Sequence, residues 1–299
     1  MPCFHPLTAY RLSNGSIVFA ERGDVVSQLQ LPCGRCIGCR LERSRQWAVR
    51  IMHESQSHSE SCFITLTYAE EHMPPLGSLV YRDFQLFMKS LRRVYPGRSI
   101  RYFVCGEYGE QLSRPHFHAC LFGVDFSDAA LVPVGKSPAG NVYYSSPILS
   151  RLWRKGFSSI GELTFQSAAY VSRYVLKKIT GRESSEHYRV VDPSSGEILG
   201  ERVPEFCAMS LKPGIGALWF HKFRSDVFPH DYVVTNGSKS KPPRYYDVLH
   251  KRISPDVHED VVYDREVDGL KRYADNTPER LVVRETVANA RLAFRKRSI

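Results

Sequence analysis

The sequence predicts an α+β fold in which strands of an antiparallel sheet alternate with helices. Three short apolar runs are rich in β-branched and aromatic residues, which is typical of strands: residues 61–68, 99–107 and 115–123. Between the first two runs, apolar residues recur at helical spacing over 82–95. A glycine-containing turn separates the last two runs, so we expect them to pair as a hairpin.

Composition favours a nucleic-acid partner. The chain has 299 residues, enough for one large domain or two, and 42% of them are hydrophobic. The formal net charge of +10 favours a polyanion, and the 16 Tyr and 16 Phe suit stacking on unpaired bases. The plain alternative is a basic protein that has no such partner.

Several classes of protein are not expected. The start of the sequence lacks the profile of a signal peptide, and no apolar run approaches the roughly 20 residues that span a bilayer. We therefore expect no membrane association and a reducing cytoplasm, where the eight cysteines act as metal ligands or buried thiols. Gly135-Lys136-Ser137 lacks the upstream glycine of a Walker A loop, so we expect no NTPase or helicase module.

The N-terminal part carries a candidate metal site. Cysteines recur at every third position, and two further potential ligands lie near the start: Cys33, Cys36 and Cys39, with Cys3 or His5. This spacing suits tetrahedral zinc. Free thiols and a redox or iron–sulfur site are the alternatives, although the fourth cysteine of an iron–sulfur run is replaced by Arg43.

The other elements follow from local patterns. A small hairpin is expected at 10–21 around an Asn-Gly turn, and a helix with basic side chains at 40–58. A polar insertion rich in Pro, Gly and Ser occupies 125–150, and a short strand is expected near 157–162.

The C-terminal part is less informative. Residues 181–203 are polar and turn-rich, and a short helix is expected at 217–223. Residues 238–246 mix basic residues, prolines and tyrosines, as in an exposed nucleic-acid contact or a linker. The tail from Arg280 is helical in pattern and basic.

Two histidines interrupt the strand at 115–123. Side chains alternate along a strand, so His116 and His118 share one face. Symmetric pairing about the turn puts Glu107 opposite His116 and diagonal to His118. Two imidazoles and a carboxylate on one face predict a divalent-metal site with open positions for water or a phosphate oxygen. The alternative is a pair of hydrogen-bonded core histidines beside a surface glutamate.

Residues 166–179 predict a helix with two different faces. Tyr170, Tyr174 and Lys177 fall within a narrow arc, and aliphatic residues lie opposite. A tyrosine needs help to attack phosphorus because its free pKa is about 10, and Lys177, one turn from Tyr174, can favour the phenolate. We expect nicking and religation of single-stranded DNA through a phosphotyrosine, with a free 3′-hydroxyl left for a polymerase. The alternative is core packing of the tyrosines.

Three motifs carry a family resemblance. His116-Phe-His118 resembles the His-hydrophobe-His motif of HUH endonucleases. Phe63-Ile-Thr-Leu-Thr-Tyr68 resembles the first motif of that family, and Tyr170-Val-Ser-Arg-Tyr-Val-Leu-Lys177 resembles its two-tyrosine motif, in the family order. With the cysteine run and Gly106-Glu-Tyr-Gly109, the pattern is similar to rolling-circle replication initiators of microviruses, in particular the gokushovirus type.

The resemblance implies an HUH fold, a five-stranded antiparallel sheet related to RRM or palm domains, with helices on one face. It implies Mg²⁺ or Mn²⁺ at His116, His118 and Glu107, and catalysis by Tyr170 and Tyr174. It also implies nicking at a phage origin in the cytoplasm of the bacterial host, with a host helicase and polymerase as partners. The cysteine run is not part of the general HUH pattern, so zinc there rests on spacing alone.

These patterns divide the chain into three segments. We expect a Cys-rich element with a basic helix at 1–58, a nuclease core at 59–182, and a C-terminal extension for DNA or partner contact at 183–299.

Three rival functions fit parts of the pattern. Histidine-triad nucleotide hydrolases use His-x-His-x-His, and here the third position is Cys120. A non-catalytic nucleic-acid-binding module with a zinc knuckle explains the charge and the cysteines, but not the histidines and tyrosines. A plasmid initiator or a transposase of the same superfamily would share the chemistry.

Overall fold

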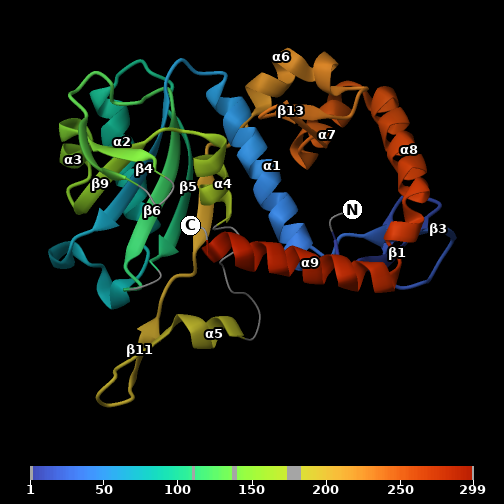
Figure 1. Cartoon of the computed structure of the whole chain (residues 1–299), viewed down its shortest axis with the longest axis horizontal. Coiled ribbons are helices and arrows are strands. Elements are labelled where there is room, and N and C mark those ends of the chain that lie inside the picture. Colours follow the sequence, from blue (N-terminus) through green and yellow to red (C-terminus); the bar gives the residue numbers. More distant parts are fainter. Residues whose placement is uncertain (1–2, 110–111, 137–139, 174–182, 298–299) are drawn as a thin grey trace. The chain divides into compact units, whose positions relative to one another are not determined.

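The computed structural model describes residues 3–109, 112–136, 140–173 and 183–297. The chain groups into two compact units, one of Arg45–Ile253 and one of Met1–Ser44 with Ser254–Ile299 (Figure 1). The three-segment division by motif and composition stays a prediction.

The larger unit is built on an antiparallel sheet. Its strand order is β12-β5-β6-β4-β9-β8-β7. The strands predicted at 61–68, 99–107, 115–123 and near 157–162 are confirmed as the neighbours β4, β5, β6 and β9. The bounds are β4 (Ser61–Tyr68), β5 (Arg101–Tyr108), β6 (Pro115–Phe122), β7 (Val132–Lys136), β8 (Val142–Ser145), β9 (Gly156–Gly161) and β12 (Phe206–Met209).

The expected five-stranded sheet is wrong in strand number, because the described part of the sheet has seven strands. The strands β7 and β8 lie within the insertion at 125–150, whose Pro, Gly and Ser content hides them from local pattern. They pair with each other, and β8 joins β9 only through Tyr144 and Ile160. The insertion therefore adds a hairpin at the edge of the sheet.

Helices cover both faces of the sheet, so the expectation of helices on one face is also wrong (Figure 1). On one face, α2 (Tyr81–Val94) and α3 (Pro147–Leu152) contribute to an aromatic core that includes Phe84, Phe117 and Trp153. On the other, α1 (Ile37–Ser55) and α4 (Phe165–Arg173) pack on Phe63 and Phe103. Successive side chains of a strand point to opposite faces of the sheet, and here both are apolar, so both faces must be shielded from water.

Residues 238–246 are neither a simple linker nor a wholly exposed contact. They run from β14 (Ser238–Ser240) into α7 (Arg244–Ile253), where Tyr246 is fully buried. Its hydroxyl lies 2.8 Å from Nδ1 of His53 on α1, and Trp219 stacks on the same imidazole. Besides β12 and β14, the described elements between α4 and α7 are α5 (Glu183–Tyr188), β10 (Arg189–Val191), β11 (Ile198–Glu201), α6 (Ala217–Val227) and β13 (Val233–Thr235).

The smaller unit combines a three-stranded sheet with two long helices. The hairpin expected at 10–21 is confirmed by β1 (Leu7–Leu12) and β2 (Ile17–Val18), and β3 (Val25–Leu31) pairs with the other edge of β1. The helices are α8 (Pro255–Lys271) and α9 (Pro278–Arg297), the latter confirming the helical tail. Among the described residues, no helix combines the length and apolarity needed to cross a bilayer.

A buried carboxylate ties the end of α1 to β5. Glu54 is fully buried and accepts hydrogen bonds from the Arg101 guanidinium on β5 and from the Gly216 N–H (2.6 Å) before α6. Burial alone raises the pKa of Glu54, but the bonds from His58, Gly216 and Arg101 outweigh it and hold the pKa below its usual value. The ionised form therefore fastens the helix to the strand that carries Glu107.

We predict that Glu54→Gln lowers the free energy of unfolding at pH 7 by about 3 kcal/mol, because Arg101 is left buried without its anion. The Glu54 pKa is depressed in the folded state, so its stabilisation is present above the unfolded pKa near 4.5 and is lost as pH falls through the folded pKa. The variant should therefore approach wild type in acid. Urea unfolding between pH 3 and 7 measures this (roughly the window of carboxyl titration).

The matched control is Glu60→Gln, which removes the partner of Arg98 in a more exposed ion pair. That change should cost less than about 1 kcal/mol. Equal losses for the two variants, or a Glu54→Gln loss that does not shrink in acid, would contradict this account of Glu54.

Candidate functional site

One row of side chains crosses four strands of the sheet. The predicted register is confirmed, since Glu107 on β5 pairs with His116 on β6. His116 in turn pairs with Thr67 on β4, and Thr67 pairs with Phe157 on β9. Directly paired residues project to the same face, so these four side chains form one row. The next row on that face holds His118 and its partner Thr65.

Each histidine is held by a threonine of β4. Nδ1 of His116 lies 3.0 Å from Oγ1 of Thr67, and Nδ1 of His118 lies 2.9 Å from Oγ1 of Thr65. A hydroxyl can donate or accept, so each imidazole can place its proton on Nδ1 and leave Nε2 as a metal ligand. Sequence reasoning missed this role of the threonines, although their spacing of two residues matches that of the histidines.

The carboxylate and the second histidine already touch. Nε2 of His118 lies 2.8 Å from Oε1 of Glu107, and both side chains are buried. Burial lowers the pKa of His116 to about 4, with smaller contributions from His118 and Arg114. His116 is therefore neutral near pH 7, the form in which imidazole binds metals.

The donor set fits a divalent cation in its chemistry, with two imidazoles and one carboxylate. The three groups do not all converge in this conformation. Nε2 of His116 faces Gly109, where a Cβ atom would lie only 2.7 Å from it, and the two imidazole centroids are 6.2 Å apart. His118 and Glu107 are the close pair, and glycine at 109 leaves room for the His116 ring.

One predicted nucleophile lies against His118. Helix α4 buries Ala168 and Val171, as its predicted aliphatic face requires. Tyr170 is 38% exposed, and its ring contacts His118 edge-on, with centroids 5.3 Å apart. Tyr174 and Lys177, the other two predicted catalytic residues, lie outside the described residues.

A groove opens beside the histidine rows. It has a volume of about 410 Å³ and is lined by hydroxyl and apolar side chains: Thr65, Thr67, Val134, Ser145, Ser150, Phe157, Ser158 and Ser159, with Gly156. Because the threonines line it and also bond the histidines, the groove adjoins the candidate site. Phe157 was not singled out from the sequence, where it reads as an ordinary strand residue.

The cysteine cluster forms as predicted, and Cys3 is its fourth member. Cys3, Cys33, Cys36 and Cys39 place their sulfurs within 4.8 Å of one another, the only such His, Cys, Asp or Glu group in the part of the chain that the structure describes. Two Sγ–Sγ distances are 3.9 and 4.0 Å. Tetrahedral zinc with Zn–S bonds near 2.3 Å separates sulfurs by about 3.8 Å.

Backbone N–H groups complete the knuckle. The N–H of Cys36 donates to Sγ of Cys33 (3.3 Å), and the N–H of Phe4 donates to Sγ of Cys36 (3.3 Å). Burial raises the pKa of Cys33, but the N–H groups of Cys36 and Arg35 outweigh it and lower that pKa to about 7. His5, the other candidate ligand, instead places Nε2 2.8 Å from Glu285. This cluster could therefore bind a metal such as zinc.

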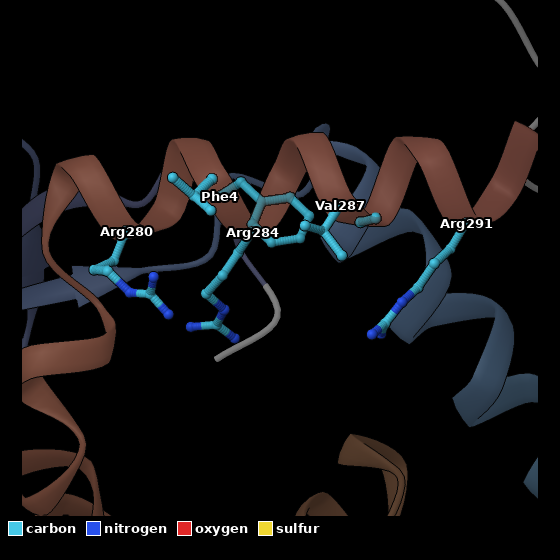
Figure 2. A pocket seen from close by; sticks show the side chains of 7 residues that line it. Phe4, Arg280, Arg284, Val287 and Arg291 are labelled. Atoms are coloured by element: carbon cyan, nitrogen blue, oxygen red, sulfur yellow. The ribbon is translucent and has the colours of Figure 1, made fainter.

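A second groove of about 410 Å³ runs along α9 in the smaller unit. Arg280, Arg284 and Arg291 extend from one side of this helix, beside Phe4 (Figure 2). Arg280 and Arg284 both pair with Asp275, at 3.0 and 3.8 Å, which offsets part of the charge. Guanidinium groups bind phosphate with two parallel hydrogen bonds, so this groove can hold a polyanion.

Comparisons with known proteins agree with the sequence resemblance. Residues 61–179, which hold the histidines, Glu107 and the tyrosine motif, match the family described as replication-associated protein ORF2/G2P. The chain is 33% identical over 267 residues to replication-associated protein VP4 of Bdellovibrio phage phiMH2K, covering 86% of this chain and 79% of that protein.

A second relative, replication-associated protein ORF2 of Spiroplasma virus 4, is 33% identical over 271 residues, with 83% and 79% of the two chains covered. Replication-associated protein ORF4 of Chlamydia phage 1 is 31% identical over 240 residues, with 78% and 57% covered. The chain therefore belongs to the family of phage replication-associated proteins. No solved structure matches it.

We predict that the wild-type protein carries about one zinc per chain and that Cys36→Ser loses it, because three thiolates close a structural site poorly. The unfolding midpoint should fall by roughly 5 °C or more, which corresponds to about 2 kcal/mol at this chain length. Elemental analysis and a thermal melt measure the two effects.

The control is His5→Ala, which should keep the zinc because His5 pairs with Glu285 and is not a ligand. A wild-type protein without zinc, or a His5→Ala variant that loses it, would contradict the four-cysteine site.

Proposed function

We propose that this protein starts rolling-circle replication by nicking and rejoining single-stranded DNA through a covalent 5′-phosphotyrosine. The observation that carries the proposal is the position of the Tyr170 ring against His118, which in turn bonds Glu107. All three residues lie in the segment that matches the replication-associated family. The names of the relatives support a role in phage replication.

His116, His118 and Glu107 would hold the divalent cation, Mg²⁺ or Mn²⁺, and Thr65 and Thr67 fix the two imidazoles from behind. When bound, such an ion neutralises charge on a phosphodiester and polarises its phosphorus–oxygen bonds. The neutral state of His116 near pH 7 keeps its ring nitrogen available for this purpose.

The reaction is a displacement at phosphorus. The phenolate oxygen of Tyr170 or Tyr174 attacks, and the bond from phosphorus to the 3′-oxygen breaks. That oxygen takes up a proton and becomes the 3′-hydroxyl primer, while the 5′-phosphate stays on the tyrosine. Lys177 favours the phenolate and offsets charge on the phosphate. A second tyrosine allows a second attack while the first holds the DNA end.

The wider setting follows from the same proposal. The chain carries no Walker A motif, so unwinding and synthesis fall to a helicase and a polymerase of the bacterial host, in its cytoplasm. The arginines along α9 supply a contact for the DNA backbone within residues 183–299. The cysteine cluster holds a structural zinc that is separate from the chemistry.

The rival reading is a zinc-containing protein that binds nucleic acid without cutting it. It leaves the bond between two buried polar groups, His118 and Glu107, without a purpose. The two readings differ in one product. A nicking enzyme leaves a protein–DNA adduct that survives denaturation, whereas a binding module leaves none.

We predict that Tyr170→Phe with Tyr174→Phe abolishes the covalent adduct and leaves DNA binding within about twofold, since only the nucleophilic oxygens are lost. The assay mixes the protein with circular single-stranded phage DNA and Mn²⁺, with EDTA as the metal control, and detects adduct after denaturation. The matched control changes two exposed tyrosines of the other unit, Tyr263 and Tyr273, to phenylalanine. Adduct that persists in the first variant would refute the nucleophile assignment.

We also predict that His116→Ala slows metal-dependent cleavage by more than about 100-fold. The loss of a metal ligand should cost more than the loss of a residue that only hydrogen-bonds a ligand. Mn²⁺ affinity, measured by calorimetry, should fall as well. The control is His230→Ala, an exposed histidine distant in sequence from the row. Undiminished cleavage by His116→Ala would rule out its role as a ligand.

A further inference from the structure

An exposed aromatic side chain ends the row that contains the histidine site. Phe157 on β9 pairs with Thr67, which pairs with His116. Its side chain is 68% exposed, although most large apolar residues of this sheet are buried. Packing in the core therefore does not account for phenylalanine at this position.

The surroundings of Phe157 form a place for a flat ligand with polar edges. The groove of about 410 Å³ at this ring is within the size range of small-molecule sites. Its walls offer the hydroxyls of Thr65, Thr67, Ser145 and Ser159. Val134, which is 57% exposed, adds apolar surface from β7. An aromatic face with hydroxyls around it suits a nucleobase, which stacks on its faces and forms hydrogen bonds at its edges.

We propose that Phe157 stacks an unpaired base of the DNA strand that is cut, and that the serine and threonine hydroxyls contact the edge of that base. This inference rests on the proposed nicking function, because it assumes that the scissile phosphate lies at His116 and His118. Aromatic side chains on the exposed face of a sheet bind single strands in this way, and the contact requires that the base be unpaired.

The register fixes where along the DNA this base lies. His116 and Phe157 are two strands apart, which is roughly 10 Å at a spacing of about 4.8 Å between strands. A stacked strand rises about 3.4 Å per nucleotide, and an extended strand rises more. The stacked base therefore lies within about three nucleotides of the bond that is cut.

The first test is equilibrium binding. A fluorescent oligothymidylate of about 20 nucleotides exceeds the site size of one single-strand-binding module. Phe157→Leu keeps an apolar side chain but removes the aromatic face, and it should weaken binding about fivefold or more, the lower end of one stacking contact. Phe157→Trp should retain or improve binding. The control is Phe19→Leu, because Phe19 is similarly exposed, at 66%, and lies in the other unit.

The second test locates the base. The nick is mapped from the wild-type adduct, and oligonucleotides spanning it carry a single abasic site at successive positions. Wild type should show one sensitive position within about three nucleotides of the nick, where adduct formation drops. Phe157→Leu should react more slowly with the intact strand and lose the extra sensitivity at that position, since the two changes remove the same contact.

The outcomes separate the two proposals. If wild type forms adduct but Phe157→Leu binds oligothymidylate as wild type does, or keeps the abasic sensitivity, the stacking site is wrong and the nicking function stands. If wild type forms no adduct with its circular substrate, the nicking function fails. The binding test then reports only on base stacking by Phe157. If Phe157→Leu weakens binding no more than Phe19→Leu does, the exposed ring serves some other partner.

Discussion

The antiparallel pairing of β5 with β6 is the constraint on which the candidate site depends. It sets Glu107 opposite His116 and within reach of His118, and the pairing of β6 with β4 brings Thr65 and Thr67 to the same two imidazoles. A slip of one residue would point the histidines into the aromatic core around Phe117, and it would point Phe117 to the other face of the sheet. Residues 119–122 of β6 are apolar on both faces, so the alternation of His116 and His118 with Phe117 is what distinguishes the two faces and holds the register.

Polar groups in the middle of a packed sheet need partners, and here they find them in each other. His118 and Glu107 are both buried, and an isolated ion or imidazole at that depth would cost several kcal/mol. The threonine hydroxyls and the histidine–carboxylate contact reduce that cost without fixing one tautomer. The same device recurs at the cysteines, where backbone N–H groups of Phe4, Arg35 and Cys36 donate to sulfur.

The sequence pattern correctly predicted those elements that are determined by residues close together in the chain. The central strands, the helix at 81–94 and the pairing of Glu107 with His116 follow from side-chain periodicity and a short turn. The strands β7, β8 and β12 are only four or five residues long, so periodicity is silent about them. β7 and β8 form a hairpin within an insertion rich in Pro, Gly and Ser, and β12 forms through its contact with β5, which is distant in sequence. The spacing of the cysteines also could not show whether Cys3 or His5 is the fourth ligand. The residue that pairs with His5, Glu285, lies 280 positions further along the chain.

The position of Tyr170 is set by hydrophobic packing, which links the core directly to the candidate site. Helix α4 docks through Ala168 and Val171 on the cluster that contains Phe63 and Phe103, and the Tyr170 ring then contacts both Phe63 and His118 edge-on. Displacing a reacting group by about 1 Å can cost 100-fold in rate. Ala168 and Val171 on the apolar face of α4 therefore act as positioning residues for Tyr170, the proposed nucleophile on the other face of the same helix.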